Sequence, residues 1–306
     1  MNTLTFKCNY AKADLNKFFK EYGFRDPKEG ESIDFSLWDT YKNKPIDSKI
    51  ILNDYKYIFN LDSKRQIYNN IEKLKLLQYI PKTFPYVSEL TDDMLDDNKI
   101  YFLKLISGSG GKDVHAIKSM KEIYTIISKK QPEHKKNINN YLLQEEVPNM
   151  YLHNGCKTGM RNYILVCDTG IYFYKEGYIH IYEKIYNNKE LDNSVHNDLF
   201  NCKYENLSNQ SYYKIILPQL YHICSELLTP YFKNISFNNK YFILGIDFII
   251  DTDYKPYLIE INGHPNLAFD CGLLSVKKDM LNDFIKFYVL PKLTNKKPEI
   301  GGWVKI

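Results

Sequence analysis

The sequence predicts an α+β fold, in which helices pack against sheets that contain antiparallel hairpins. Helix-like and strand-like segments follow one another without the regular strand–helix–strand alternation of a parallel sheet. A polar turn also joins two apolar strands at 245–265. With 306 residues, of which 44% are hydrophobic and 25% charged, the chain can bury a full core and is expected to form two or three domains.

The spacing of apolar residues locates the individual elements. Helices are predicted where such residues recur every three or four positions, as Ile67, Ile71 and Leu74 do after a capping Asp62 or Ser63. The predicted helices cover 14–22, 63–77, 119–129, 213–231 and 278–289. The predicted strands cover 49–59, 98–106, 141–147, 162–168, 170–174 and the two apolar halves of 245–265. A polar loop is expected at 131–140, and a long irregular insertion at 184–210. The polar runs 129–140 and 187–193 are expected to be solvated.

Composition argues against several classes of function. The net charge is only +4, well below that of a dedicated nucleic-acid binder. The six cysteines form no CxxC pair and the seven histidines show no HExxH spacing, so a zinc site is not expected. No apolar run approaches membrane-spanning length and the N-terminus lacks a signal-like apolar core. We therefore expect a cytoplasmic protein with no nucleic-acid or membrane partner.

The most informative segment is 245–265, where charged residues interrupt two apolar strands. Asp247 lies among isoleucines and a phenylalanine in the first strand, and Glu260 and Asn262 lie two residues apart in the second. A carboxylate with such neighbours is costly to desolvate unless a cation meets it. The segment therefore predicts either a charged site or a buried polar pair that neighbouring backbone groups satisfy.

The register of this hairpin decides whether its polar side chains meet. If the turn is centred between Asp253 and Tyr254, then Asp247 lies opposite Glu260, and Asn262 shares their face. Three oxygen ligands on one face suit Mg²⁺, which takes few carboxylates and leaves positions for phosphate oxygens. A slip of one residue would turn Asp247 to the opposite face.

A glycine-rich loop follows a strand that carries a lysine. Lys104 lies near the end of an apolar strand, and Gly108, Gly110 and Gly111 follow within seven residues. Glycines let backbone N–H groups approach phosphate oxygens, and a neighbouring lysine neutralises charge. The loop matches neither the Walker A nor the GxGxxG pattern, because Asp113 occupies a position that each motif gives to another residue. Taken alone, it fits a phosphate cradle and a plain flexible hairpin equally.

Two polar segments flank predicted strands. Gln144, Glu145 and Glu146 end one strand, where extended backbone can hydrogen-bond an adenine edge, although a domain hinge with solvated acids has the same pattern. Lys157 and Arg161 precede the strand at 162–168. Arg161 can project into a site or pair with a carboxylate of the hairpin, and a surface strand end would look similar.

Taken in order, these segments resemble the ATP-grasp ligases and, within them, the tubulin–tyrosine ligase-like family. The resemblance covers roughly 53–267, beginning with DSKRQIYNNI and IPKTFPYV. It continues through YFLKLISGSGGKDVHAI, LLQEEV, KTGMRNYILV, IYFYKEGYIHIY, VHNDLFNCK and GIDFIIDTDYKPYLIEINGHPNL. These segments are similar to the family's lysine strand with glycine loop, adenine hinge, Lys-x-Asp-x-Arg strand, acceptor-side strand, Leu-Thr-Asn segment and metal hairpin. Motifs that match in order are far more specific than any one of them.

The resemblance implies an ATP-grasp fold with three domains. A small N-terminal α/β domain is expected at 1–60, a central domain with the glycine loop at 61–140, and a C-terminal catalytic domain with the metal hairpin at 141–306.

The resemblance also implies roles for single residues. The ATP-binding residues would be Lys64, Lys104, Gly108, Gly110, Gly111, Gln144, Glu145, Val147 and Lys157. The Mg²⁺ ligands would be Asp247, Glu260 and Asn262. Arg161 would stabilise the charge that develops at the reacting acyl group, and Lys157, the second catalytic residue, would contact ATP phosphates as Lys104 does. His180 and Asn201 would contact the substrate. Without the resemblance, Lys64 would be interpreted as an ordinary solvated helix residue.

Family chemistry implies ATP-dependent amide formation with ATP and Mg²⁺. A protein carboxylate is phosphorylated, and the amine of a free amino acid displaces the phosphate. The acceptor would be a protein with an acidic tail, such as tubulin, and the added amino acid would be glutamate, glycine or tyrosine. Positioning and charge stabilisation suffice for this reaction, so it needs no nucleophilic serine or cysteine.

Three positions depart from the family pattern. Gly159 replaces the Asp of Lys-x-Asp-x-Arg, His180 replaces an Arg on the acceptor-side strand, and Phe200 replaces the Thr of Leu-Thr-Asn, while Asn201 is kept. These departures favour an active ligase with altered substrates. Two alternatives stay open: a ligase for a small peptide or metabolite, and a catalytically weak relative that only binds nucleotide or protein.

Overall fold

The computed structural model describes residues 4–8, 12–37, 48–52, 60–108, 113–192, 201–237, 239–267 and 274–306. Helices and β-sheets are mixed throughout these ranges, in agreement with the predicted combination of helices and hairpins. Within them, no helix has both the length and the apolar character that crossing a bilayer requires.

The N-terminal segment forms the parallel part of the larger sheet. Its elements are β1 (Leu4–Cys8), α1 (Lys12–Glu21), β2 (Phe24–Arg25), β3 (Ile33–Leu37) and β4 (Ser48–Leu52). β1 pairs in parallel with β2 and β3, and β4 pairs in parallel with β3 and β14. The ring of Phe6 in β1 stacks on Phe19 of α1 and on Phe35 of β3, with ring centroids 4.1 and 5.6 Å away. This aromatic packing fixes α1 on one face of the sheet.

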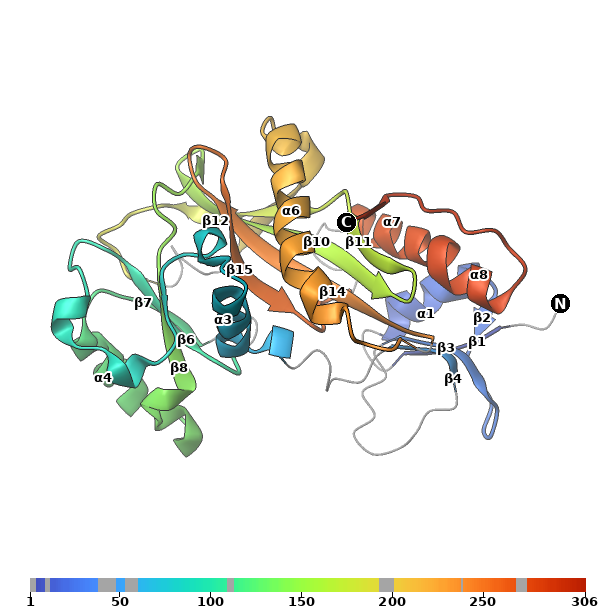
Figure 1. The fold of residues 1–306 in the computed structure, drawn as a ribbon, viewed down its shortest axis with the longest axis horizontal. Coiled ribbons are helices and arrows are strands. Elements are labelled where there is room, and N and C mark those ends of the chain that lie inside the picture. Colours follow the sequence, from blue (N-terminus) through green and yellow to red (C-terminus); the bar gives the residue numbers. More distant parts are fainter. Residues whose placement is uncertain are drawn as a thin grey trace.

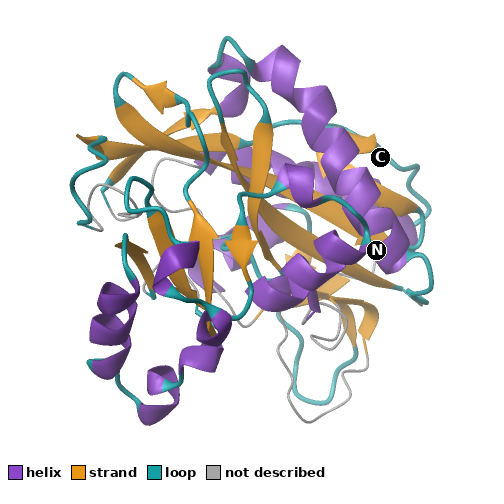
Figure 2. Ribbon diagram, turned by 60° about the vertical axis from the view of Figure 1, so that its left-hand side comes forward, coloured by secondary structure: helices purple, strands orange, loops and turns teal. Residues whose placement is uncertain are grey.

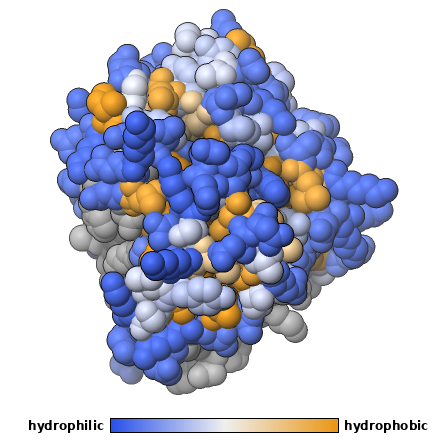
Figure 3. Space-filling view, turned by 90° about the vertical axis from the view of Figure 1, so that its left-hand side faces the viewer, coloured by the Kyte–Doolittle hydropathy of each residue, from blue (hydrophilic) through white to orange (hydrophobic). Residues whose placement is uncertain are grey.

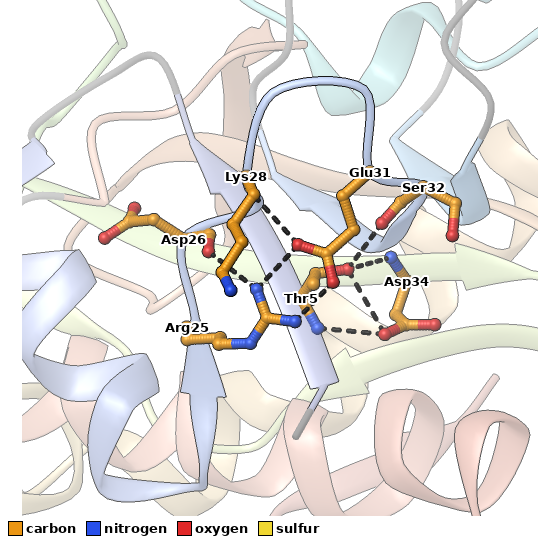
Figure 4. A network of polar contacts seen from close by, with 7 residues as sticks. All are labelled: Thr5, Arg25, Asp26, Lys28, Glu31, Ser32 and Asp34. Atoms are coloured by element: carbon orange, nitrogen blue, oxygen red, sulfur yellow. Dashed lines mark hydrogen bonds and ion pairs between the residues drawn. The ribbon is translucent and has the colours of Figure 1, made fainter. Parts of the chain in front are cut away.

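A polar network holds the loop after β2 against β1 and β3. The Thr5 N–H donates to the Asp34 carboxylate at 2.9 Å, and the Asp34 N–H donates to the Thr5 hydroxyl at 2.8 Å. The Glu31 carboxylate accepts from both the Arg25 guanidinium and the Lys28 N–H, the latter at 2.8 Å. Figure 4 shows the two groups of contacts side by side at the edge of the sheet. These contacts satisfy the backbone N–H groups of Thr5, Lys28 and Asp34.

The remaining strands extend this sheet to twelve in the part of the chain that is described. They are β9 (Leu152–His153), β10 (Cys156–Cys167), β11 (Gly170–Tyr174), β12 (Tyr178–Ile185), β13 (Cys202–Asn206), β14 (Lys240–Ile250), β15 (Pro256–Asn262) and β16 (Trp303–Lys305). The main order is β13-β12-β10-β14-β4-β3-β1-β2. β9 and β11 also pair with β10, β15 pairs with β14, and β16 pairs with β11. The long strands β10 and β14 therefore form the centre of the molecule.

Helices cover both faces of these central strands. They are α6 (Tyr213–Phe232), α7 (Leu274–Phe284), a π-helical segment at Ile285–Val289 and α8 (Leu290–Leu293). Side chains alternate along β10: Tyr163 and Leu165 enter the core with α1 and α7, whereas Ile164 and Val166 enter the core with α6 and α3. Figure 1 shows α6 lying across β10 and β14, and Figure 2 shows the strands running between the helices.

A separate four-stranded sheet forms the other end of the molecule (Figure 1). Its order is β5-β8-β6-β7, and its elements with helix α4 are β5 (Thr83–Phe84), β6 (Tyr101–Leu105), β7 (Val114–Ile117), α4 (Met120–Ser128) and β8 (Tyr141–Glu145). Ser119 and Glu122 form a capping box at the start of α4, which agrees with the helix predicted there. Short 3₁₀ turns occupy Leu77–Tyr79, Val87–Glu89, Asp92–Met94, Glu133–Lys136, Ile138–Asn140 and Leu207–Asn209. The outer face at this end is mainly hydrophilic, with small separate apolar patches (Figure 3).

Helix α3 (Lys64–Lys73) connects the two sheets. Ile67 and Ile71 pack into the core beneath α6. On the other side of the helix, the Arg65 guanidinium donates to three backbone carbonyls of the small-sheet region, at 2.7 to 3.0 Å, and stacks over the Tyr86 ring at 4.7 Å. Because α3 is fixed to both parts, its first residue, Lys64, is held at their junction.

Some predicted boundaries were wrong. The helix predicted at 63–77 ends at Lys73, because Lys75 takes a left-handed backbone conformation with φ 59°. The strand predicted at 162–168 is only the second half of β10. Part of the insertion predicted at 184–210 is the regular strand β13, whereas 193–200 and most of the strand predicted at 49–59 lie outside the described residues. The division into domains at 1–60, 61–140 and 141–306 stays a prediction.

Candidate active site

A cavity of about 520 Å³ lies between the two sheets. Its walls come from α3, from β6 and β8 of the small sheet, and from β10, β12, β14 and β15 of the large sheet. Twelve predicted site residues line it: Lys64, Lys104, Gly108, Gln144, Glu145, Val147, Lys157, Arg161, His180, Asp247, Glu260 and Asn262. Among the predicted residues that are described, Asn201 alone is not part of this wall. Gly110, Gly111 and Phe200 lie outside the described residues.

The hairpin of β14 and β15 places its polar residues on the cavity side. Asp247 pairs directly with Glu260, as the sequence predicted, and the Asn262 side-chain N–H donates to Asp247 Oδ2 at 3.0 Å. Phe248 and Leu258, the next pair toward the turn, point into the core beneath α6. One face of the hairpin is thus apolar and packed, and the other carries the acids.

A β-bulge produces this register. The Asp251 carboxylate accepts the N–H groups of Asp253 and Lys255, both at 2.9 Å, so the turn is centred on Asp253. A regular ladder from that turn would pair Asp247 with Ile259 and would send Glu260 to the core face. The register shifts by one residue between Asp247 and Phe248, and Ile259 is the extra residue. The assumed turn centre, between residues 253 and 254, was therefore wrong, although the pairing it predicted is confirmed.

Each acid of the hairpin meets a cation. Arg161 lies opposite Asp247 across β10 and β14, and its guanidinium donates to both carboxylate oxygens, with Nη2 2.7 Å from Oδ2. Lys64 Nζ lies 3.2 Å from Glu260 Oε2 and donates to the Gly108 carbonyl at 2.6 Å. Burial alone would lower the pKa of Arg161, but the Asp247 carboxylate outweighs burial and raises it well above its ordinary value. These pairs explain how the acids tolerate their apolar surroundings.

Two further lysines reach the cavity from opposite sheets. Lys104 of β6 is 8% exposed and donates to Gln144 Oε1 at 2.5 Å, so its near partner is a neutral amide. Burial lowers its pKa to about 7, although Glu260 offsets part of this effect. Lys157 of β10 is 3% exposed, lies 3.1 Å from Glu146 Oε1 and stacks over the Phe102 ring at 4.3 Å. Burial lowers its pKa as well, against the opposing effect of Glu146.

The charges of the cavity favour an anionic ligand. Three of its four cations have a carboxylate partner, and Lys104 is the one that hydrogen-bonds to an amide instead. A buried ammonium without a counter-charge is destabilised by desolvation, so an anion that enters the cavity gains strongly from it. Phosphate and carboxylate groups are the anions that lysine and arginine side chains bind through strong, charge-assisted hydrogen bonds.

The donor set suits Mg²⁺ in its chemistry. Two carboxylates and one amide oxygen lie on the same face of the hairpin, next to the lysines. Among the described residues, three or more His, Cys, Asp or Glu side chains are nowhere grouped so as to hold a metal by themselves. Mg²⁺ commonly binds one or two carboxylates and completes its shell with water and substrate phosphates. The residues present therefore fit a metal that arrives with a phosphate ligand.

Two acids named in the sequence analysis, Glu146 and Asp113, form ion pairs at the cavity that the sequence did not predict. Glu146 accepts from both Lys157 and the Tyr186 hydroxyl, and thereby joins the end of β8 to β10 and β12. Asp113, at the end of the glycine loop, is held by Lys130 at 3.1 Å and by Lys135 at 2.8 Å. These two lysines were expected only to be solvated in a polar loop. An acid directly after a glycine-rich loop is the signal that could have indicated the contact.

Comparison with known protein families identifies the family of this chain. The family model described as "Tubulin-tyrosine ligase family" matches residues 43–215 and 203–297. These ranges cover most of the chain, and the chain therefore belongs to the tubulin-tyrosine ligase family.

Curated relatives share about a quarter of the aligned residues. The chain is 24% identical to tubulin polyglutamylase TTLL6 of Mus musculus, across 95% of this chain and 40% of that protein. It is 23% identical to tubulin glycylase 3B of Tetrahymena thermophila, across 64% of this chain and 19% of that protein. It is also 23% identical to tubulin monoglycylase TTLL3 of Homo sapiens, across 63% of this chain and 28% of that protein. The chain spans less than half the length of these three relatives.

Proposed function

We propose that this chain is a cytoplasmic ligase, dependent on ATP and Mg²⁺, that joins the amino group of a free amino acid to a carboxylate of a protein acceptor. The observation that carries this proposal is the cavity between the sheets, where two opposed acids of one hairpin share a wall with four cations. The acceptor we favour is tubulin or a protein with a similar acidic tail, because the relatives are named as tubulin-modifying enzymes.

We further propose that the fold is of the ATP-grasp type, with domains at 1–60, 61–140 and 141–306. In this arrangement the nucleotide lies in the cavity. Its base contacts the end of β8 at Gln144, Glu145 and Val147, and its phosphates lie near the lysines. The support is positional: these groups line one cavity and come from both sheets.

Different residues would bind the phosphates and the metal. Lys64 and Lys104 would hold the phosphates, together with backbone N–H groups of the glycine loop. Lys157, which contacts Glu146 after the end of β8, would bind the nucleotide toward its base. Asp247, Glu260 and Asn262 would hold Mg²⁺, which when bound would neutralise phosphate charge. For this, Asp247 and Glu260 must exchange part of their contact with Arg161 and Lys64 for the metal.

The reaction would proceed in two displacements. An acceptor carboxylate oxygen attacks the γ-phosphorus of ATP, the bond to ADP breaks, and an acylphosphate forms. The neutral amine of the amino acid then attacks the acyl carbon, phosphate leaves with its oxygen, and the nitrogen loses a proton. Arg161, freed in part from Asp247, would face the negative charge that develops on the acyl oxygen. The protein contributes position and charge, and no residue becomes covalently modified.

Release of ADP tests this function. Purified protein with ATP and Mg²⁺ would be given each of the twenty amino acids in turn, with and without tubulin. Turnover that requires tubulin and one amino acid is the expected result. A further mixture would contain a short acidic peptide in place of tubulin. Turnover with this peptide but not with tubulin would show that the acceptor is a small molecule and not a protein. An absence of ADP in every mixture, with no shift of the melting temperature by ATP, would overturn the ligase proposal.

A single variant tests the metal assignment. Glu260→Gln keeps the side-chain volume but removes a charged oxygen ligand, so turnover should fall about a hundredfold or more while the fold persists. Glu89→Gln, at an exposed position of the small-sheet region, is the matched control and should keep full activity. Equal activity of the two variants at every Mg²⁺ concentration would refute the role given to Glu260.

A further inference from the structure

Gly159 and His180 form one structural unit on the cavity wall. They are direct cross-strand partners on β10 and β12, and both line the cavity. A Cβ atom at residue 159 would lie closer than 3.0 Å to both Nε2 and Cε1 of His180. The imidazole ring therefore occupies the space that a side chain at 159 would need. The backbone of Gly159 is not in the left-handed region, so the glycine is required for this room rather than for its conformation.

This unit lies halfway along the proposed nucleotide site. Residues 157, 159 and 161 alternate onto the same face of β10, so Gly159 lies about 7 Å from both Lys157 and Arg161. Lys157 contacts Glu146 at the end of β8, where the base is placed, and Arg161 contacts Asp247 at the metal end. A nucleotide with its base near Lys157 and its phosphates near Arg161 would place its sugar between these two residues, next to His180.

The imidazole is suited to neutral hydrogen bonds. Burial lowers the pKa of His180 to about 3, with Arg161 and Lys157 acting in the same direction, so the ring stays neutral at physiological pH. A neutral imidazole offers one N–H donor and one acceptor nitrogen. Nε2 lies 3.5 Å from the Tyr182 hydroxyl, and in the described part of the chain Nδ1 has no hydrogen-bond partner. A hydroxyl group, which both donates and accepts, matches such a ring better than a phosphate does.

We propose that His180 binds the ribose hydroxyls of ATP, and that Gly159 is the residue that gives the ring room to do so. This inference rests on the proposed function, because it requires ATP to lie in the cavity with its base at β8. It makes His180 and Gly159 a matched pair: a larger residue at 159 displaces the ring, and loss of the ring leaves the sugar without its partner.

Calorimetric binding of two nucleotides, ATP and 2′,3′-dideoxy-ATP, both with Mg²⁺, tests the inference without any turnover. The unmodified protein should prefer ATP by about tenfold, the amount that one or two hydrogen bonds contribute. His180→Ala should weaken ATP binding about tenfold and leave the dideoxy nucleotide unchanged. Gly159→Ala should give the same loss through displacement of the ring. His153→Ala, on the neighbouring strand β9 and off the cavity wall, is the matched control and should change neither affinity.

A second pair of variants separates a hydrogen-bonding role from a structural one. His180→Asn keeps a neutral donor and acceptor and should keep most of the preference for ATP. In His180→Ala, adding Gly159→Asp places a carboxylate in the vacated space and should restore the preference, because a carboxylate accepts from both hydroxyls. Equal loss of affinity for both nucleotides in His180→Ala, or no preference in the unmodified protein, would overturn this inference alone. A protein that bound neither nucleotide would overturn the proposed function as well.

Discussion

Replacing Lys104 with methionine should stabilise the fold while removing nucleotide binding. Lys104 is 8% exposed, and its ammonium hydrogen-bonds to the Gln144 amide instead of to a carboxylate. Burial lowers its pKa from the ordinary 10.5 to about 7, which means that the folded protein holds this charge at a cost. Methionine has a similar length and no charge, so Lys104→Met removes the cost and keeps most of the packing.

The size of the effect follows from the pKa. One pKa unit corresponds to about 1.4 kcal/mol, so the depressed pKa corresponds to a cost of about 4 kcal/mol near neutral pH. Loss of the bond to Gln144 leaves a buried amide oxygen unpaired, which costs about 1–3 kcal/mol. The expected net result is a rise of about 2 kcal/mol in the free energy of unfolding.

The stability advantage of Lys104→Met should decrease as the pH rises. Between the folded pKa of about 7 and the ordinary 10.5, the unfolded chain binds more protons than the folded one. The stability of the unmodified protein therefore rises with pH through this window, and the advantage of Lys104→Met shrinks. Between pH 7 and pH 9 the difference between the two proteins should fall by about 2 kcal/mol.

Urea unfolding followed by circular dichroism, at several pH values, measures these differences. Lys121→Met, which removes an exposed charge on α4, is the control and should leave the stability nearly unchanged. Calorimetry should show that Lys104→Met no longer binds ATP. A methionine variant that is the less stable protein at pH 7, or whose advantage does not change with pH, would contradict the cost assigned to the buried Lys104 ammonium.

Two further predictions concern the framework of the site. Arg65→Ala should lower the free energy of unfolding by about 2–4 kcal/mol, because three backbone carbonyls of the small-sheet region lose a charged donor; urea unfolding that matches the unmodified protein would contradict it. Gly301→Ala should cost at least about 1–2 kcal/mol more than Gly23→Ala in the same assay. Both glycines have positive φ, but a Cβ at Gly301 would lie closer than 3.0 Å to the Asp283 carboxylate, whereas Gly23 has nothing within 4 Å. Equal melting temperatures for the two alanine variants would refute the steric argument.

Much of the site could be read from local sequence because its residues follow apolar strands directly. Lys104, Arg161 and Asp247 each lie in or beside a run of apolar residues that can only be buried. A charged residue in such a run needs a partner, and the partners predicted for the hairpin acids are cationic in the structure. The register of the predicted hairpin gave the pairing of Asp247 with Glu260, which the structure confirms. The order of the motifs added the expected adenine contact at Gln144, which stays a prediction.

Other contacts could not be inferred because they join distant segments. Nothing in a polar loop indicates that Lys130 and Lys135 would turn back onto Asp113. The same holds for Arg65, whose guanidinium reaches carbonyls 20 to 76 residues away. Such contacts depend on how whole elements pack, and the local pattern carries no record of that packing.

The sequence by itself determined the class of the fold, the family, and most of the charged residues that line the cavity, because buried charge and apolar periodicity are local properties. The tertiary structure decided how those residues face one another. The bulge at Ile259 brings Glu260 opposite Asp247, which the position of the turn alone would not do. The absence of a side chain at Gly159, on one strand, gives the imidazole of His180, on the next strand, its place in the cavity. The register of two strands, and the room that a residue on one strand leaves for a side chain on the next, are defined only once the strands pair.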